Sequence, residues 1–255
     1  MTLSTVRCTA FGAALALTSV LLLASCAGAH GTAEADQQLA ASCPAKSIAS
    51  TTAIDVSGSF QSDSVHTGTL DAIAIEVRRT AICGGHLRAF AFASSTGATM
   101  MLYDGDLIVD APTENAQLRK AGKLADQTLA TITEHYDRAL TDVTGYGSDP
   151  LGMLALFQQT NTAYPGHALT NVLVTDGALN IGIDPTSVPN ADAARALADQ
   201  QQVPDLSGAE LSIIGIGKQG TGELPSSVIA NLTAFWEQIC RNTGASTCHV
   251  STEGR

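Results

Sequence analysis

The sequence predicts an α/β fold of three layers, in which helices cover both faces of a doubly wound, mainly parallel, six-stranded sheet. Two observations predict it. Short apolar runs alternate along the chain with longer segments whose apolar residues recur every three to four positions. One run, NVLVT at residues 171–175, has the composition of a strand buried on both faces. Such alternation is typical of parallel sheets, because a helix links each strand to the next.

The strands are predicted from apolar runs that turn residues separate. The first two are expected at residues 52–56 and 87–93. Apolar stretches at 100–103 and 107–109 flank Asp104-Gly105, which predicts either a third strand or a hairpin there. Further strands are predicted at residues 171–175, 210–216 and 248–251.

The helices are predicted from apolar residues at helical spacing, which place one stripe of each helix against a core. The first helix has this stripe at Leu70, Ile73, Ala74, Val77 and Ala81. The longest has it at Leu118, Ala121, Ala125, Leu129, Ile132, Tyr136 and Ala139. Shorter helices are expected at residues 151–157 and 191–198, and a last one opens at Pro225 with Val228, Leu232, Phe235 and Ile239 facing inward.

The first 25 residues have the features of an export signal. They contain one basic residue, Arg7, no acidic residue, and an apolar run at 11–24 that is too short and too rich in small residues to span a bilayer. The sequence LASC at 23–26 resembles the lipobox of bacterial lipoproteins, in which cleavage precedes a cysteine that carries acyl chains. The resemblance implies a signal peptide and a lipid anchor on Cys26. An ordinary secretory signal cut nearby is the alternative.

The remainder of the chain is predicted to be an anchored extracytoplasmic domain. Residues 26–42 have little to bury, which predicts a lipid anchor followed by a flexible spacer. Residues 43–255 are long enough for one globular domain with its own core. No other membrane segment is predicted, so the expected membrane contact is the lipid alone.

The charge balance argues against nucleic-acid binding. The chain has 13 basic and 24 acidic residues and a net charge of −11. Without residues 1–25, which include Arg7 and no acid, 12 basic and 24 acidic residues remain and the net charge is −12. Nucleic-acid binding requires basic stripes, whereas an acidic surface suits a metal-binding or well-solvated extracellular protein.

Polar residues gather where predicted strands end and one helix begins. Asp55, Ser57 and Ser59 follow the first strand, with Gly58 permitting the bend, and Asp176 follows the buried strand at 171–175. Ser148 precedes a predicted helix. Because ligands of such sheets bind at the carboxyl ends of the strands, these loops are expected to meet.

This set resembles the metal-ion-dependent adhesion site of von Willebrand factor type A (vWA) domains, whose pattern is Asp-x-Ser-x-Ser, then Thr, then Asp. The resemblance covers roughly residues 43–255. It implies a metal site made of Asp55, Ser57, Ser59, Ser148 and Asp176. Serine at 148 departs from the family's usual threonine; it keeps the hydroxyl and lacks the methyl group that restricts the rotamer.

The resemblance also implies a ligand and a function. Mg²⁺ prefers six oxygen ligands and usually retains water. Mg²⁺ is therefore the expected cofactor, with Mn²⁺ able to substitute, and a glutamate or aspartate of a partner protein is the expected sixth ligand. The implied protein is a membrane-anchored extracytoplasmic binding module and not an enzyme.

Two alternatives use the same residues. In one, an envelope lipoprotein has a structural role and the metal only stiffens the loops. In the other, Asp55 is the nucleophile of a Mg²⁺-dependent phosphoryl transfer. The haloacid-dehalogenase pattern requires a second aspartate where Ser57 stands, and no general acid is evident. The sequence has neither a Gly-x-Ser-x-Gly elbow nor a phosphate-binding loop.

Four cysteines remain after Cys8 leaves with the signal and Cys26 is assigned to the anchor, and an even count in an oxidising compartment predicts two disulfides. Zinc is disfavoured because the cysteines form no Cys-x-x-Cys pair and the histidines have no ligand spacing. A strand starts after Cys43, and the helix that ends at Cys83 runs antiparallel to it. Both cysteines are therefore expected at the sheet edge opposite the metal. Cys240 and Cys248 bracket the link from the last helix to the last strand. The predicted pairs are Cys43–Cys83 and Cys240–Cys248.

Overall fold

The computed structural model describes residues 27–60, 62–94, 97–143, 147–179, 182–220 and 222–253. The predicted signal peptide at 1–25 and the predicted anchor Cys26 lie outside the described residues. Within the described part of the chain, no helix has the length and apolar character needed to cross a membrane.

A six-stranded sheet forms the centre of the fold, with strand order β3-β2-β1-β4-β5-β8. β3 is antiparallel to β2, and the other neighbouring strands are parallel. A separate two-stranded hairpin, β6-β7, was not predicted, because two residues per strand give no apolar run. The strands are β1 (Ile48–Asp55), β2 (Gly85–Phe92), β3 (Thr99–Leu107), β4 (Ala168–Val174), β5 (Ala209–Ile214), β6 (Lys218–Gln219), β7 (Gly222–Glu223) and β8 (Thr247–Ser251).

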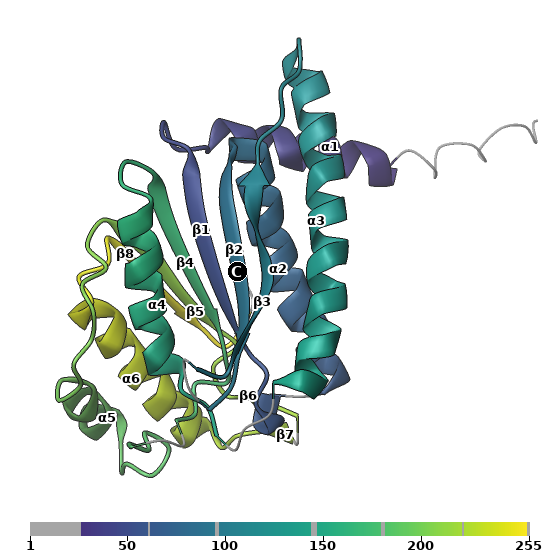
Figure 1. Cartoon of the computed structure of the whole chain (residues 1–255). Coiled ribbons are helices and arrows are strands. Elements are labelled where there is room, and N and C mark those ends of the chain that lie inside the picture. Colours follow the sequence, from purple (N-terminus) through teal and green to yellow (C-terminus); the bar gives the residue numbers. More distant parts are fainter. Residues whose placement is uncertain are drawn as a thin grey trace, which may run out of the picture.

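Helices cover both faces of this sheet, which confirms the predicted fold class (Figure 1). One face carries α2 (Asp63–Cys83) and α3 (Glu114–Asp142). The other carries α4 (Pro150–Ala163), α5 (Ala191–Ala198) and α6 (Ser226–Asn242). Four helices begin where a side chain accepts a hydrogen bond from a first-turn amide, which satisfies a donor that the helix itself leaves unpaired. These capping residues are Ser62, Thr113, Asp149 and Asn190.

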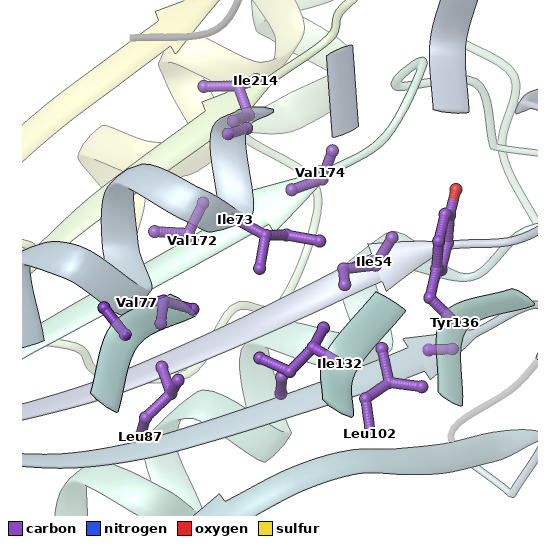
Figure 2. Packing of buried hydrophobic residues seen from close by; sticks show 14 of the residues in the cluster. Ile54, Ile73, Val77, Leu87, Leu102, Ile132, Tyr136, Val172, Val174 and Ile214 are labelled. Atoms are coloured by element: carbon purple, nitrogen blue, oxygen red, sulfur yellow. The ribbon is translucent and has the colours of Figure 1, made fainter. Parts of the chain in front are cut away.

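The sheet separates two apolar cores. Figure 2 shows Ile73 of α2 and Ile132 of α3 packed over Ile54 of β1. On the opposite face, Phe157 and Trp236 are fully buried against the strands. Each large apolar side chain buried in this way contributes about 1.5–3 kcal/mol, so the two cores hold the strand ends in fixed positions.

Two strands differ from their predicted bounds. β1 begins at Ile48, four residues before the predicted start at 52, because its polar residues are buried along with its apolar ones. β3 is one continuous strand that runs through Asp104, so the hairpin alternative is wrong. Across the strands, Asp104 accepts a hydrogen bond from Arg88 at 3.1 Å, and Asp106 lies 2.7 Å from a ring nitrogen of His86. These pairs stabilise β3 against β2, in agreement with the single-strand alternative.

The N-terminal segment also differs from the predicted flexible spacer. Ala27–Ala41 forms a helix, α1, which packs near α2 and α3 (Figure 1). Asp36 is buried on α1 and accepts two hydrogen bonds from the guanidinium of Arg78, at 2.6 and 2.7 Å. Leu39 and Ala40 pack against the core. The composition of this segment did not indicate the helix, because the helix is held by Arg78, which is far away in the sequence.

Both predicted disulfides are present. Cys43–Cys83 joins the segment before β1 to the end of α2, and Cys240–Cys248 joins α6 to β8. The chain-entropy estimate for their closed loops is about 4 kcal/mol for the longer one and about 2.6 kcal/mol for the shorter one.

Candidate metal site

The predicted site residues lie together at the carboxyl ends of β1 and β4. Asp55 is the last residue of β1, and Ser57 and Ser59 follow it, the latter in a short 3₁₀ helix at Gly58–Phe60. Asp176 stands two residues after the end of β4, and Ser148 stands two residues before α4. This edge of the sheet lies near β6 and β7, at the end of the molecule opposite α1 (Figure 1).

Asp55 joins three chain segments through its carboxylate. The side chain is fully buried. Its Oδ2 atom accepts hydrogen bonds from Ser148 Oγ at 2.6 Å and from Thr175 Oγ1 at 2.7 Å. Its Oδ1 atom accepts the amide N–H of Ser57 at 2.9 Å. The carboxylate therefore fixes the hydroxyl of Ser148 and the backbone of the first loop relative to each other.

Asp176 is the second buried carboxylate of the site. Its Oδ1 atom accepts the amide N–H of Ala178 at 2.9 Å, and its Oδ2 atom accepts Gln219 Nε2 at 3.3 Å. The hydroxyl oxygens of Ser57 and Ser59 are 3.4 Å apart, and Ser59 also interacts with Asp176. All five predicted residues are thus connected through short polar contacts.

Backbone contacts hold the loops that carry these side chains. The amide of Val56 donates to Phe92 O at 2.9 Å, and the amide of Asp149 donates to Ala93 O at 3.0 Å. Both bonds reach the end of β2, so the first loop and the start of α4 are fastened to the same strand. The buried ring of Phe60 anchors the turn that follows Ser59.

Gly177 lets the loop after β4 pass close to α6. Its φ is +79°, and a Cβ atom there would lie 2.6 Å from Ile216 Cδ1 and 2.8 Å from Trp236 Nε1. Trp236 Nε1 donates to the carbonyl of Gly177 at 2.9 Å. A side chain at 177 would therefore displace the loop that begins with Asp176.

The two carboxylates sit in a site that disfavours their negative charge. Burial raises the pKa of Asp55 above its usual value, although hydrogen bonds from Ser148, Ser57 and Thr175 act in the opposite direction. Burial, and then the charge of Asp55, raise the pKa of Asp176 to about 6. Among the described residues, no Lys, Arg or His forms an ion pair with either carboxylate. A bound cation would supply the missing positive charge.

The donor set fits a hard divalent cation better than zinc. In the described part of the chain, no group of three or more His, Cys, Asp or Glu side chains is placed to hold a metal ion. The cluster instead combines two carboxylates with the hydroxyls of Ser57, Ser59 and Ser148. Adjacent ligands of octahedral Mg²⁺ are about 3 Å apart, since each metal–oxygen distance is about 2.1 Å. The separation of 3.4 Å between the Ser57 and Ser59 oxygens is close to that spacing.

Comparisons with known proteins find similarity at the level of the fold. No protein-family model and no curated protein matches the chain. One similar solved structure is the conserved hypothetical protein BatB from Bacteroides thetaiotaomicron, with 13% identity, coverage of 81% of this chain and 90% of that one, and a TM-score of 0.43. A mutant of the PilB minor pilin from Streptococcus sanguinis has 15% identity, coverage of 83% and 58%, and a TM-score of 0.47. Manganese-loaded TRAP protein from Plasmodium vivax has 15% identity, coverage of 75% and 63%, and a TM-score of 0.36. The chain therefore spans less than two thirds of the length of the PilB and TRAP proteins.

Two residues of the cluster were not predicted. Thr175 stands between β4 and Asp176, and its hydroxyl donates to Asp55 while accepting the amide of Gly177 at 3.1 Å. Its position beside Asp176, at the end of a buried strand, could have indicated that Thr175 belongs to the site. Gln219 reaches Asp176 from the short β6 strand. Nothing in the local sequence pattern indicates that contact, because it depends on how the hairpin folds back.

Proposed function

We propose that this chain is an extracytoplasmic binding module that holds a protein partner through a divalent cation. One observation carries the proposal: two fully buried carboxylates, Asp55 and Asp176, converge with three serine hydroxyls, and no described basic side chain pairs with either acid. Buried negative charges require a compensating positive charge, and a cation bound among oxygen ligands provides it.

Each residue has a separate role in this proposal. The hydroxyls of Ser57, Ser59 and Ser148 would bind Mg²⁺, and Mn²⁺ would substitute. Asp55 orients the Ser148 hydroxyl through their 2.6 Å hydrogen bond, and Asp176 would contribute a second negative charge to the site. A glutamate or aspartate of the partner would complete the ligand set that these residues would provide.

We propose that residues 1–25 are removed on export and that acyl chains on Cys26 hold the protein on a membrane. α1 lies at the end of the molecule opposite β6 and β7, so an anchor that precedes α1 would leave the metal edge facing away from the membrane (Figure 1). Labelling of cells with an alkyne-bearing fatty acid tests this: the label should enter the wild-type protein and be absent from Cys26→Ala.

An enzymatic role for Asp55 is less well supported. Both of its carboxylate oxygens accept hydrogen bonds, and the side chain is fully buried. A nucleophile must contact its substrate, and a side chain with no exposed surface does not. The contacts of Asp55 instead suit a residue that positions the hydroxyls of its neighbours.

Two experiments, first on metal binding and then on partner binding, test the proposal. Isothermal titration calorimetry on residues 27–255 should detect uptake of Mg²⁺ or Mn²⁺, and Asp55→Ala should abolish it while circular dichroism shows an intact fold. Asp71→Ala, at an exposed carboxylate on α2, is the matched control and should bind metal normally. Affinity capture from envelope extracts should recover a partner with Mg²⁺ and lose it with EDTA. Folded wild-type protein that takes up neither metal contradicts the proposal.

A further inference from the structure

A groove of about 650 Å³ lies beside the candidate metal site. The loop after β4 forms one wall, with Leu179 and Ile183. Leu224, after β7, and Val228, in the first turn of α6, form the other. A volume of this size is within the usual range for a ligand site.

Two residues link the groove to the metal site. Ala178 lines it, and the amide of this residue donates to Asp176 Oδ1 at 2.9 Å. Gln219 also lines it and donates to Asp176 Oδ2 at 3.3 Å. The same two residues therefore contact Asp176 and border the groove, so a partner segment bound at the metal would have its next side chains over the groove.

The lining selects for apolar side chains. Ile183, Leu224 and Val228 are only partly buried, so they present apolar surface that a ligand can cover. Asp184 is the charged residue among the described lining side chains. Burial opposes its charged form, but hydrogen bonds from Thr186 and Ser187 outweigh this effect and lower the pKa of Asp184. The carboxylate therefore remains ionised at neutral pH and makes the groove less favourable for a second acidic side chain.

We propose that the groove binds a large apolar side chain that lies two residues from the metal-binding acid in an extended segment of the partner. In an extended chain, residues i and i+2 point to the same side, so the acid and the apolar residue reach the protein together. This proposal rests on the proposed function and adds the partner's sequence character: an acidic residue, any residue, then leucine, isoleucine or phenylalanine, in either chain direction.

Two synthetic peptides test the proposal. One is acetyl-Gly-Leu-Gly-Glu-Gly-Leu-Gly-amide, which covers both chain directions, and the other has serine in place of both leucines. Binding to residues 27–255 in saturating Mg²⁺ is measured by NMR titration of ¹⁵N-labelled protein. The leucine peptide should bind at least about tenfold more tightly, because burial of an aliphatic side chain in a pocket gives discrimination of that order.

Groove variants assign the effect to this surface. Val228→Glu should remove the preference for leucine and leave Mg²⁺ affinity unchanged. Ile183→Ser should also reduce the preference, and it serves as the readout if Val228→Glu does not fold. Ile75→Ser is the matched control, because Ile75 is an exposed apolar residue on α2, 42% accessible, and its variant should keep the full preference.

The outcomes separate the two proposals. If both peptides bind equally in Mg²⁺ and release in EDTA, the groove assignment is wrong and the proposed function stands. The groove assignment is also wrong if folded Val228→Glu and Ile183→Ser keep the preference. If the folded protein takes up Mg²⁺ but neither peptide binds, the groove assignment is wrong and the proposed function stands. If the folded protein takes up no metal, the proposed function fails, and the groove assignment that rests on it fails as well.

Discussion

Replacing Asp176 by asparagine should make the metal-free protein more stable at neutral pH. Burial and the charge of Asp55 raise the pKa of Asp176 from the ordinary 3.8 to about 6. A rise of about two units corresponds to about 3 kcal/mol of destabilisation when the carboxyl is ionised. Asparagine carries no charge, and its amide oxygen can still accept the hydrogen bond from Ala178. The variant should therefore recover up to about 3 kcal/mol.

The pH dependence identifies the cause of this gain. Because the folded-state pKa of Asp176 is above the unfolded-state value, the contribution of this group to the stability of the metal-free wild type is most favourable below about pH 4. It falls as the pH rises to about 6 and is then constant with respect to this group. The advantage of Asp176→Asn should thus be only about 0.5 kcal/mol at pH 4 and reach its full value by pH 7.5.

Urea unfolding in EDTA measures this difference. Fluorescence of Trp236 is a suitable signal, because this tryptophan is the single one in the chain and its indole donates to the loop at Gly177. Asp71→Asn, at an exposed carboxylate, should change stability little at any pH. A variant at 176 that is no more stable than wild type at pH 7.5, or whose advantage is the same at pH 4, would refute the electrostatic reasoning.

Affinity for Mg²⁺ should fall up to about tenfold per pH unit below about pH 6, because Asp176 must lose its proton to serve the metal; calorimetry at several pH values checks this. Replacing Cys240 and Cys248 together by serine should cost about 2–3 kcal/mol, read from urea midpoints, since their bridge closes a short loop. Ile132→Ala should cost about 2–5 kcal/mol in thermal or urea unfolding, because this side chain is fully buried between α3 and the sheet.

The fold was largely predictable because apolar spacing reports which face of each element is buried. The helical stripe that ends at Ala139 and the strand at 171–175 both match elements of the structure. The start of β1 was missed because Ser50 and Thr51 are polar yet fully buried in the sheet. Spacing could not reveal α1, whose position depends on the Asp36–Arg78 pair between segments far apart in sequence.

The candidate site was also predictable only in part. Parallel strands bring their carboxyl ends to one edge, so Asp55 and Asp176 could be placed together from the strand predictions alone. Ser148 required the further step of locating the start of α4. Gln219 could not be found, because β6 contains two residues and its return toward Asp176 is a tertiary contact.

The distribution of stabilising contacts explains how the fold tolerates this site. Two buried carboxylates without a described basic partner destabilise the carboxyl edge of the sheet. The bridge Cys43–Cys83 and the pair Asp36–Arg78 lie on α1, α2 and the entry to β1, at the other end of the strands. These two cross-links therefore stabilise the fold at the end away from the metal edge. A cation that binds at Asp55 and Asp176 would remove the local repulsion directly, so metal binding and order of the edge loops should be coupled through those two residues.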